Sequence, residues 1–510
     1  MRLFSSLALV SCLLGTRLIL YVYQLLASPL WSIPGPWPAR FTKLWYFWKL
    51  RGGHFEAVNK DLHDKYGPIV RYAPNRYSFN DTHASKAIYG LGNHFTKSDW
   101  YDASSNPGAW SLFADRDVSR HARNRRLYQN IYSMSSVVAY EGFVFECAEL
   151  FCERLTELAQ WGLPFNMGYW LQCYAFDVIG CITYSKRLGF LDKGEDVGQV
   201  ISALEDNLVY AALIGVYSWL HPYLFAAWNF FAGGTGAGRE YVMNFTRGCM
   251  TDFQASPKAM AFNREDIGPR TASSILSKFF AKHRDNPDTF TSYHILVGCT
   301  SNMVAGSDTT AISLSAIIYY LLNNPTVLRK LRDEIDAVYD ADQIDKNQHI
   351  GFKRTQEMKY LQATIKEALR MHPATGLPLE RVVPEGGATI CNHFFPEGSV
   401  VGINTWIENR NPSIYGTDVD KFRPERWLTE DTAKLSMMNE HWMPFGAGSR
   451  TCIGRHISHL EMSTLIPTIL RQFEFQLSGE LAKSGAEWKT TNNFFVKPRN
   501  FILQVKTREL

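Results

Sequence analysis

The hydrophobic positions of the chain follow mainly the period of an α-helix. Residues 293–323 are a long, mostly apolar run that ends just before Pro325, which predicts a central buried helix because proline stops one helix and begins the next. Residues 355–372 carry apolar side chains on one face, and the segment from Arg455 onward has helical periodicity. Shorter apolar runs predict strands at residues 69–71, 399–404 and 494–504. The pattern predicts a mainly α fold with a small β-rich lobe.

The N-terminal segment predicts a membrane anchor over residues 1–30. Residues 3–30 are long enough to cross a bilayer, and the proline-rich hinge 31–38 cannot continue a helix. Arg17 costs about 2.5 to 3.5 kcal/mol near a helix centre, but the Leu, Ile, Val and Phe side chains, at about 0.5 kcal/mol each, outweigh it. Lys and Arg are denser after the span, so we expect the body on the cytoplasmic side. A cleaved signal peptide, favoured by the shorter run 3–14, is the alternative.

Composition narrows the class of protein. A net charge of +4 over 510 residues is too small to indicate nucleic-acid binding. Nine cysteines with no C-x-x-C pair predict neither a zinc ribbon nor a disulfide framework. No linker or repeat divides the chain, so residues 39–510 are expected to form one catalytic domain. The glycine-rich residues 233–239 follow an aromatic stretch without a preceding strand, which indicates a flexible turn and not a phosphate loop.

One cysteine has an unusual setting. Gly446 and Gly448 permit a tight turn, Cys452 follows, and a helix begins at Arg455. Free N–H groups and the positive end of the helix dipole favour an anionic sulfur there, the form that binds metal. A lone cysteine is more often a small core residue.

The residues from Phe445 to Gly454 match the F-x-x-G-x-R-x-C-x-G signature, and by it the chain resembles the cytochrome P450 family of haem-thiolate monooxygenases. The resemblance implies that Cys452 is the axial ligand of haem iron. It also implies that Phe445, Arg450 and Gly454 contact the haem.

The central helix carries a second motif, Ala-Gly-Ser-Asp-Thr-Thr at residues 305–310. Buried polar groups cost free energy unless they are satisfied. Hydroxyls bonded to their own helix, with Asp308 paired elsewhere, would satisfy them without any catalytic role. The string is similar to the family's oxygen-activation motif, which implies that Gly306 makes room for O2 and that Asp308 and Thr309 deliver protons.

Glu367 and Arg370 stand three residues apart on a predicted helix, where such pairs are usually solvated. Phe422 to Trp427 resembles the family's second conserved arginine motif. The resemblance implies that Glu367, Arg370 and Arg426 form a buried network that supports the cysteine loop.

Residues 119–126 contain a basic cluster, and charge runs are usually solvated faces. In the family a helix at this place sends a basic residue to a haem propionate, which leaves His121 and Arg125 as candidates. Arg381 matches another propionate-binding position, and Arg450 completes the set.

The resemblance implies a monooxygenase with haem b, reduced by NADPH through a separate cytochrome P450 reductase, with cytochrome b5 as an optional partner, in the endoplasmic reticulum membrane. A haem-thiolate isomerase or dehydratase, or a haem-binding sensor, are the alternatives. The general likeness is to fungal members of secondary metabolism of the pisatin demethylase type. The pocket regions of the family are apolar and aromatic here, at residues 97–113, 209–219, 376–380 and 492–495, which predicts a hydrophobic small-molecule substrate.

Overall fold

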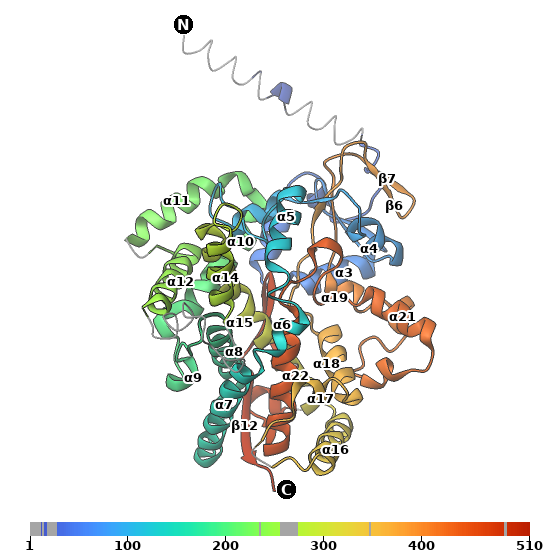
Figure 1. The fold of residues 1–510 in the computed structure, drawn as a ribbon. Helices are drawn as coiled ribbons and strands as arrows, with labels where there is room; N and C mark the ends of the chain where they lie inside the picture. Colours follow the sequence, from blue (N-terminus) through green and yellow to red (C-terminus); the bar gives the residue numbers. More distant parts are fainter. Residues whose placement is uncertain are drawn as a thin grey trace.

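The helix α15 (Ser292–Leu322) runs through the middle of the molecule, as predicted for residues 293–323 (Figure 1). It packs against α8 (Met167–Tyr184), α18 (Lys359–Met371) and α22 (Arg455–Gln472). The structure is a computed structural model, and it describes residues 12, 15–17, 28–233, 236–255, 274–345, 348–483 and 487–509. Apolar side chains from these helices form the largest buried cluster.

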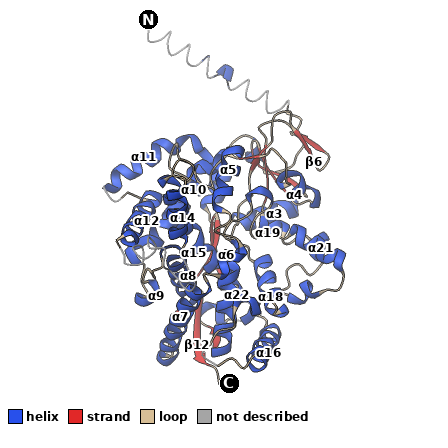
Figure 2. Ribbon diagram, viewed as in Figure 1, coloured by secondary structure: helices blue, strands red, loops and turns tan. Residues whose placement is uncertain are grey.

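The other α-helices of the described residues surround this centre. In chain order they are α2 (Leu44–Arg51), α3 (Phe55–Tyr66), α4 (Thr82–Tyr89), α5 (Val118–Tyr128), α6 (Met134–Val138), α7 (Glu141–Trp161), α9 (Phe190–Lys193), α10 (Val200–Ile214), α11 (His221–Ala232), α12 (Gly238–Gln254), α14 (Ile275–Asp285), α16 (Pro325–Ala341), α17 (Phe352–Thr355), α19 (Thr405–Glu408), α20 (Pro412–Tyr415) and α21 (Thr432–His441). Helices α10, α11, α12 and α14 lie on one side of the molecule, and β6, β7 and α4 lie toward the other (Figure 1). Figure 2 shows that helix dominates, so the mainly α prediction is confirmed.

The strands form small sheets. The largest has the order β1-β2-β8-β5-β3, and its neighbours pair antiparallel except for β2 and β8. Its strands are β1 (Ile69–Ala73), β2 (Arg76–Phe79), β3 (Thr96–Lys97), β5 (Arg381–Val382) and β8 (Val400–Ile403). The others are β4 (Phe165–Asn166), β6 (Ala388–Ile390), β7 (His393–Phe395), β9 (Phe473–Leu477), β10 (Lys489–Asn493), β11 (Phe495–Arg499) and β12 (Ile502–Thr507). The predicted β-rich lobe is confirmed.

Two predicted elements are divided. The run 494–504 is not one strand: β11 pairs with β10, and β12 pairs with β4 and β9. Between them Asn500 has a φ of 53°, a left-handed angle that ends an extended strand. The predicted helix 355–372 is likewise broken between α17 and α18.

The predicted anchor, residues 1–30, lies mostly outside the described residues. Within the described part, one segment is long and apolar enough to cross a membrane, Val197–Ala232, and 44% of its most apolar window is buried. It is bent at Gly198 and Tyr217 and belongs to the folded body.

Several large apolar side chains of α11 are exposed on the surface. Phe230 and Phe231 are 80% and 84% exposed and Leu224 is also exposed. Trp228 is half-buried and stacks on Tyr210 with ring centroids 4.8 Å apart. Phe225 is half-buried against His221.

Candidate active site

The cysteine loop is held in a tight turn. The φ angles of Gly446 and Gly448 are 70° and 63°, which are unfavourable for other residues. A Cβ atom at Gly448 would overlap the carbonyl oxygen of Tyr89, so only glycine fits there. The Cys452 N–H donates to the carbonyl of Phe445 at 2.8 Å, and α22 begins three residues later.

The Cys452 side chain is accessible to solvent, although it lies in a recess with protein groups around it. Burial raises the pKa of its thiol more than the Gly454 N–H, Arg125 and Arg455 lower it. The helix donors therefore act in the predicted direction, although burial outweighs them. A coordinated thiol is deprotonated outright, because the charge of the metal adds the missing stabilisation.

Basic side chains gather beside this loop from different elements. They are Lys97 on β3, His121 and Arg125 on α5, Arg381 on β5, and Arg450. Burial and the charges of its neighbours, Arg450 above all, lower the pKa of His121 to about 3. Burial and Arg381 lower the pKa of Arg450 to about 10. Both shifts have burial as their main cause, with the positive charge of neighbouring arginines adding to it.

The cluster has few anionic partners. Both terminal nitrogens of Arg450 are buried without a hydrogen bond. Arg381 donates to the main-chain carbonyl of Glu380 at 2.8 Å. Asp115, the nearby acid, pairs with Arg120 at 2.8 Å. Such a cluster fits a bound group with more than one negative charge.

The structure places both open candidates at this cluster. His121 is 3% exposed, and its pKa responds to Arg450, Arg125, Lys97 and Arg381. Arg125 is half-buried between the cluster and the Cys452 thiol. Lys97 was missed as a site residue because no motif surrounds it.

The side chains of Asp308 and Thr309 in the α15 motif have hydrogen-bond partners inside the protein. The Thr309 hydroxyl donates to the Ala305 carbonyl at 2.7 Å, four residues earlier on the same helix. Asp308 is 1% exposed and accepts from Lys497 Nζ at 3.2 Å and from Gln172 Nε2. These contacts are the ones expected without a catalytic role, so geometry alone does not assign one. The Asp308 Oδ2 atom has no hydrogen bond.

Two further partners of α15 were not anticipated. A Cβ atom at Gly306 would lie 3.0 Å from Ile179 of α8, so this glycine allows the two helices to approach closely. Thr310 hydrogen-bonds Glu461 of α22, and burial raises the pKa of that carboxyl well above its usual range. Only the packing of α15 against α8 and α22 reveals these pairs.

Glu367, Arg370 and Arg426 come together with fully buried side chains. Arg370 donates hydrogen bonds to both carboxylate oxygens of Glu367, from Nη2 at 2.8 Å and from Nε at 2.9 Å. Arg426 Nε lies 3.3 Å from Glu367 Oε1. Trp427 Nε1 donates to Glu367 at 2.9 Å. Removing one partner would leave a buried charge without compensation.

This network reaches the cysteine loop through Asn409. Arg370 Nη1 donates to the Asn409 carbonyl at 2.8 Å, and the Asn409 side chain accepts from the Met443 N–H at 3.4 Å. Met443 precedes Phe445 by two residues, and the Phe445 ring packs against Trp442. The network therefore positions the backbone from which the loop starts.

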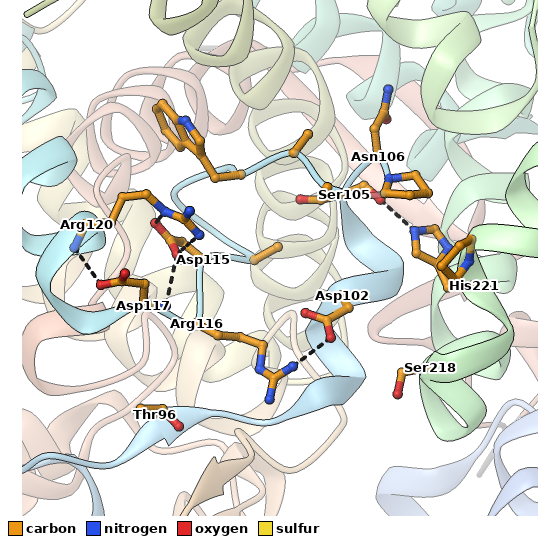
Figure 3. A pocket seen from close by; sticks show the side chains of 16 residues that line it. Thr96, Asp102, Ser105, Asn106, Asp115, Arg116, Asp117, Arg120, Ser218 and His221 are labelled. Atoms are coloured by element: carbon orange, nitrogen blue, oxygen red, sulfur yellow. Dashed lines mark hydrogen bonds and ion pairs between the residues drawn. The ribbon is translucent and has the colours of Figure 1, made fainter.

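A cavity of about 600 Å³ lies between the segment that follows β3 and the start of α11. Its wall includes Asp115, so it borders the cationic cluster, but Cys452 and Thr309 do not line it. Figure 3 shows two ion pairs on its wall, Asp102 with Arg116 and Asp115 with Arg120. The wall is therefore more polar than the sequence regions suggested.

Comparison of the sequence with known proteins shows to which family the chain belongs. The model of the family "Cytochrome P450" matches residues 34–505. The chain is 37% identical to a cytochrome P450 monooxygenase of Aspergillus terreus, over 89% of this chain and 92% of that protein. It is 36% identical to a pisatin demethylase of Fusarium vanettenii, over 94% and 91% of the two chains. A third relative, the cytochrome P450 monooxygenase cicH of Emericella nidulans, is 35% identical over 93% of both.

The chain belongs to the cytochrome P450 family, and it is a monooxygenase of that family. The family implies a haem, and the residues present fit one. Cys452 offers an accessible sulfur beside basic side chains, and both terminal nitrogens of one of them, Arg450, have no hydrogen bond. A thiolate ligand with two propionates would balance these charges.

Proposed function

We propose that the protein transfers one atom of O2 to a hydrophobic small molecule in fungal secondary metabolism, by hydroxylation, epoxidation or oxidative dealkylation. The observation that carries the proposal is Cys452, enclosed on its loop before α22 and flanked by uncompensated cations. Haem b, bound through Cys452, supplies the chemistry of oxygen activation.

The cationic side chains hold and orient the haem. Arg450, Arg381 and either His121 or Arg125 are the candidates to bind its propionates, with Lys97 beside them. Because their mutual repulsion is relieved only by an anion, cofactor binding should also stabilise the folded chain. Phe445 and Gly454 would border the ring.

Thr309 and Asp308 would move protons to the reacting oxygen. Lys497 Nζ lies between Asp308 and Glu205, at 3.2 and 2.9 Å. Glu205 is partly exposed on α10, so this chain of groups connects a buried carboxyl with solvent. Lys497 can hold Asp308 in place until the carboxyl turns toward Thr309.

Electrons would come from NADPH through a separate cytochrome P450 reductase, with cytochrome b5 as an optional partner. We place the protein in the endoplasmic reticulum membrane, anchored by residues 1–30 with the catalytic domain 39–510 in the cytosol. The apolar composition of the first segment supports this topology.

The ligand assignment is tested by the Cys452→Ser variant. Thiolate donation gives the reduced, carbon monoxide-bound haem a strongly red-shifted Soret band, and serine cannot supply it. We expect this band in the wild type and its loss in the variant. A variant that kept the band would remove the proposed ligand. Turnover that consumed no NADPH with purified reductase would instead favour an isomerase or dehydratase.

A further inference from the structure

Arg239, near the start of α12, is a buried cation that the proposed reaction does not use. It is 8% exposed, and its Nε atom has no hydrogen bond. Within the described part of the chain no ion pair to its guanidinium is found. Burial lowers its pKa, and the neighbouring phenol of Tyr293 and carboxyl of Glu240 only partly offset this. A buried charge without a partner costs several kcal/mol, so a ligand could recover much of that free energy.

The carboxyl closest in sequence is engaged elsewhere. Glu240 accepts from Asn106 Nδ2 at 2.8 Å and from Arg247 Nη1 at 3.2 Å. Consecutive residues do not face each other on a helix, which explains why Glu240 does not pair with Arg239.

Arg239 lines a small cavity together with other unpaired polar atoms. The Asn106 Oδ1 and Thr300 Oγ1 atoms also line it, and both are buried without a hydrogen bond. The volume of about 10 Å³ suits one oxygen atom. A single water could bond to the three groups, but it would not neutralise the guanidinium charge.

This small cavity adjoins the 600 Å³ cavity of Figure 3. The two share Ser105, Asn106, Ala109 and Trp110 as wall residues. On the larger wall, Asp102 and Asp115 are paired with arginines. The negative charges of Asp102 and Asp115 are therefore balanced, and they repel an anion in the larger cavity less than unpaired carboxylates would.

We propose that Arg239, with Thr300, forms a subsite that binds the carboxylate of an apolar acid whose hydrocarbon part lies in the larger cavity. This inference rests on the proposed function in that it names the substrate class, a hydrophobic carboxylic acid. The cation supplies the charge, and the Thr300 hydroxyl can donate a second hydrogen bond.

The test compares decanoate with its neutral analogue decanamide, by calorimetric titration of the full-length, haem-loaded protein. Hydrogen bonds to a charged group are strong enough for about a ten- to hundredfold preference for the acid. Arg239→Met should abolish this preference by weakening decanoate alone, and Thr300→Val should lower decanoate affinity by a few fold. Arg239→Lys, which keeps the charge, should retain part of the preference.

The matched control is Arg284→Met, an exposed position on α14 outside this set of contacts, which should leave both affinities unchanged. Arg239→Met should melt no lower than the wild type, because it removes a buried cation without a partner. Equal binding of decanoate and decanamide to the wild type would overturn the proposal, as would an acid preference that survives Arg239→Met. Acetate that bound as well as decanoate would show a general anion site instead. Calorimetry needs no turnover, and the carbon monoxide spectrum tests the haem ligand separately.

Discussion

The hydroxyl of Thr309 illustrates how little a single residue reveals by itself. In the structure it donates to the carbonyl of Ala305, as many helical threonines do. Its setting differs from the ordinary case because the adjacent carboxyl of Asp308 is buried and tied to Lys497, which in turn contacts Glu205. These contacts connect the residue next to Thr309 with a carboxyl that is partly exposed to solvent.

We predict that Thr309→Ala separates NADPH consumption from product formation. A hydroxyl can hold reduced oxygen and an ordered water until the second proton arrives, whereas alanine cannot. A shift of about 1.4 kcal/mol between two competing barriers changes their partition tenfold. NADPH consumption should largely persist while hydrogen peroxide rises and product falls, measured side by side.

Asp308→Asn is the informative companion, and it should slow turnover as a whole because it interrupts the supply of protons to Thr309. If Thr309→Ala kept the wild-type yield of product per NADPH, its hydroxyl would be an ordinary helix-bonded group.

At the scale of elements, the position of the cysteine loop depends on parts far apart in sequence. Gly448 touches the carbonyl of Tyr89 at the end of α4, and the buried pair of Glu367 and Arg370 on α18 reaches the loop through Asn409. The sequence shows the signature around Cys452, but the contacts that hold the loop are tertiary and do not appear in it. The conformation of the cysteine loop therefore depends on these contacts with α4 and α18.

We predict that Arg370→Ala yields little haem-loaded protein. Breaking a buried pair typically costs about 3 to 5 kcal/mol, a large part of a domain's stability of about 5 to 15 kcal/mol. The control is Arg329→Ala on α16, an exposed arginine whose loss should change stability by less than about 0.5 kcal/mol. Haem content and thermal unfolding should be measured for both variants. Similar values in the two would mean that the network around Glu367 does not support the loop.

At the scale of the whole molecule, the body and the proposed anchor have separate tasks. The family match begins at residue 34, just after the anchor segment. The largest buried cluster of the described residues is formed from Tyr128 onward, and Leu30, at the end of the anchor segment, is buried in a smaller cluster with Ile69 and Phe79. Membrane binding and haem binding should therefore be separable.

We predict that deletion of residues 1–30 releases much of the protein from membranes and leaves haem content unchanged. Some association should persist through exposed side chains of α11, Phe230 and Phe231 among them. The measurement is flotation of both proteins with lipid vesicles, together with the haem spectrum. Folded, soluble protein without haem would show that the deleted segment has a structural role.

The sequence by itself determined the features that depend on neighbours along the chain. Apolar periodicity predicted α15 and α22, the glycines predicted the turn before Cys452, and the motifs identified Asp308, Thr309 and Cys452 as candidates. Short-range sterics and the helical period depend only on residues close together in the chain, so the sequence is enough to predict them.

Only the tertiary structure decided which distant groups meet. It divided the run 494–504 between two sheets, raised the pKa of the Cys452 thiol through burial, and brought Lys497 to Asp308. It also left Arg239 buried among groups that do not neutralise it. Burial and long-range electrostatics depend on everything that packs around a group, and no local pattern in the chain encodes that surrounding.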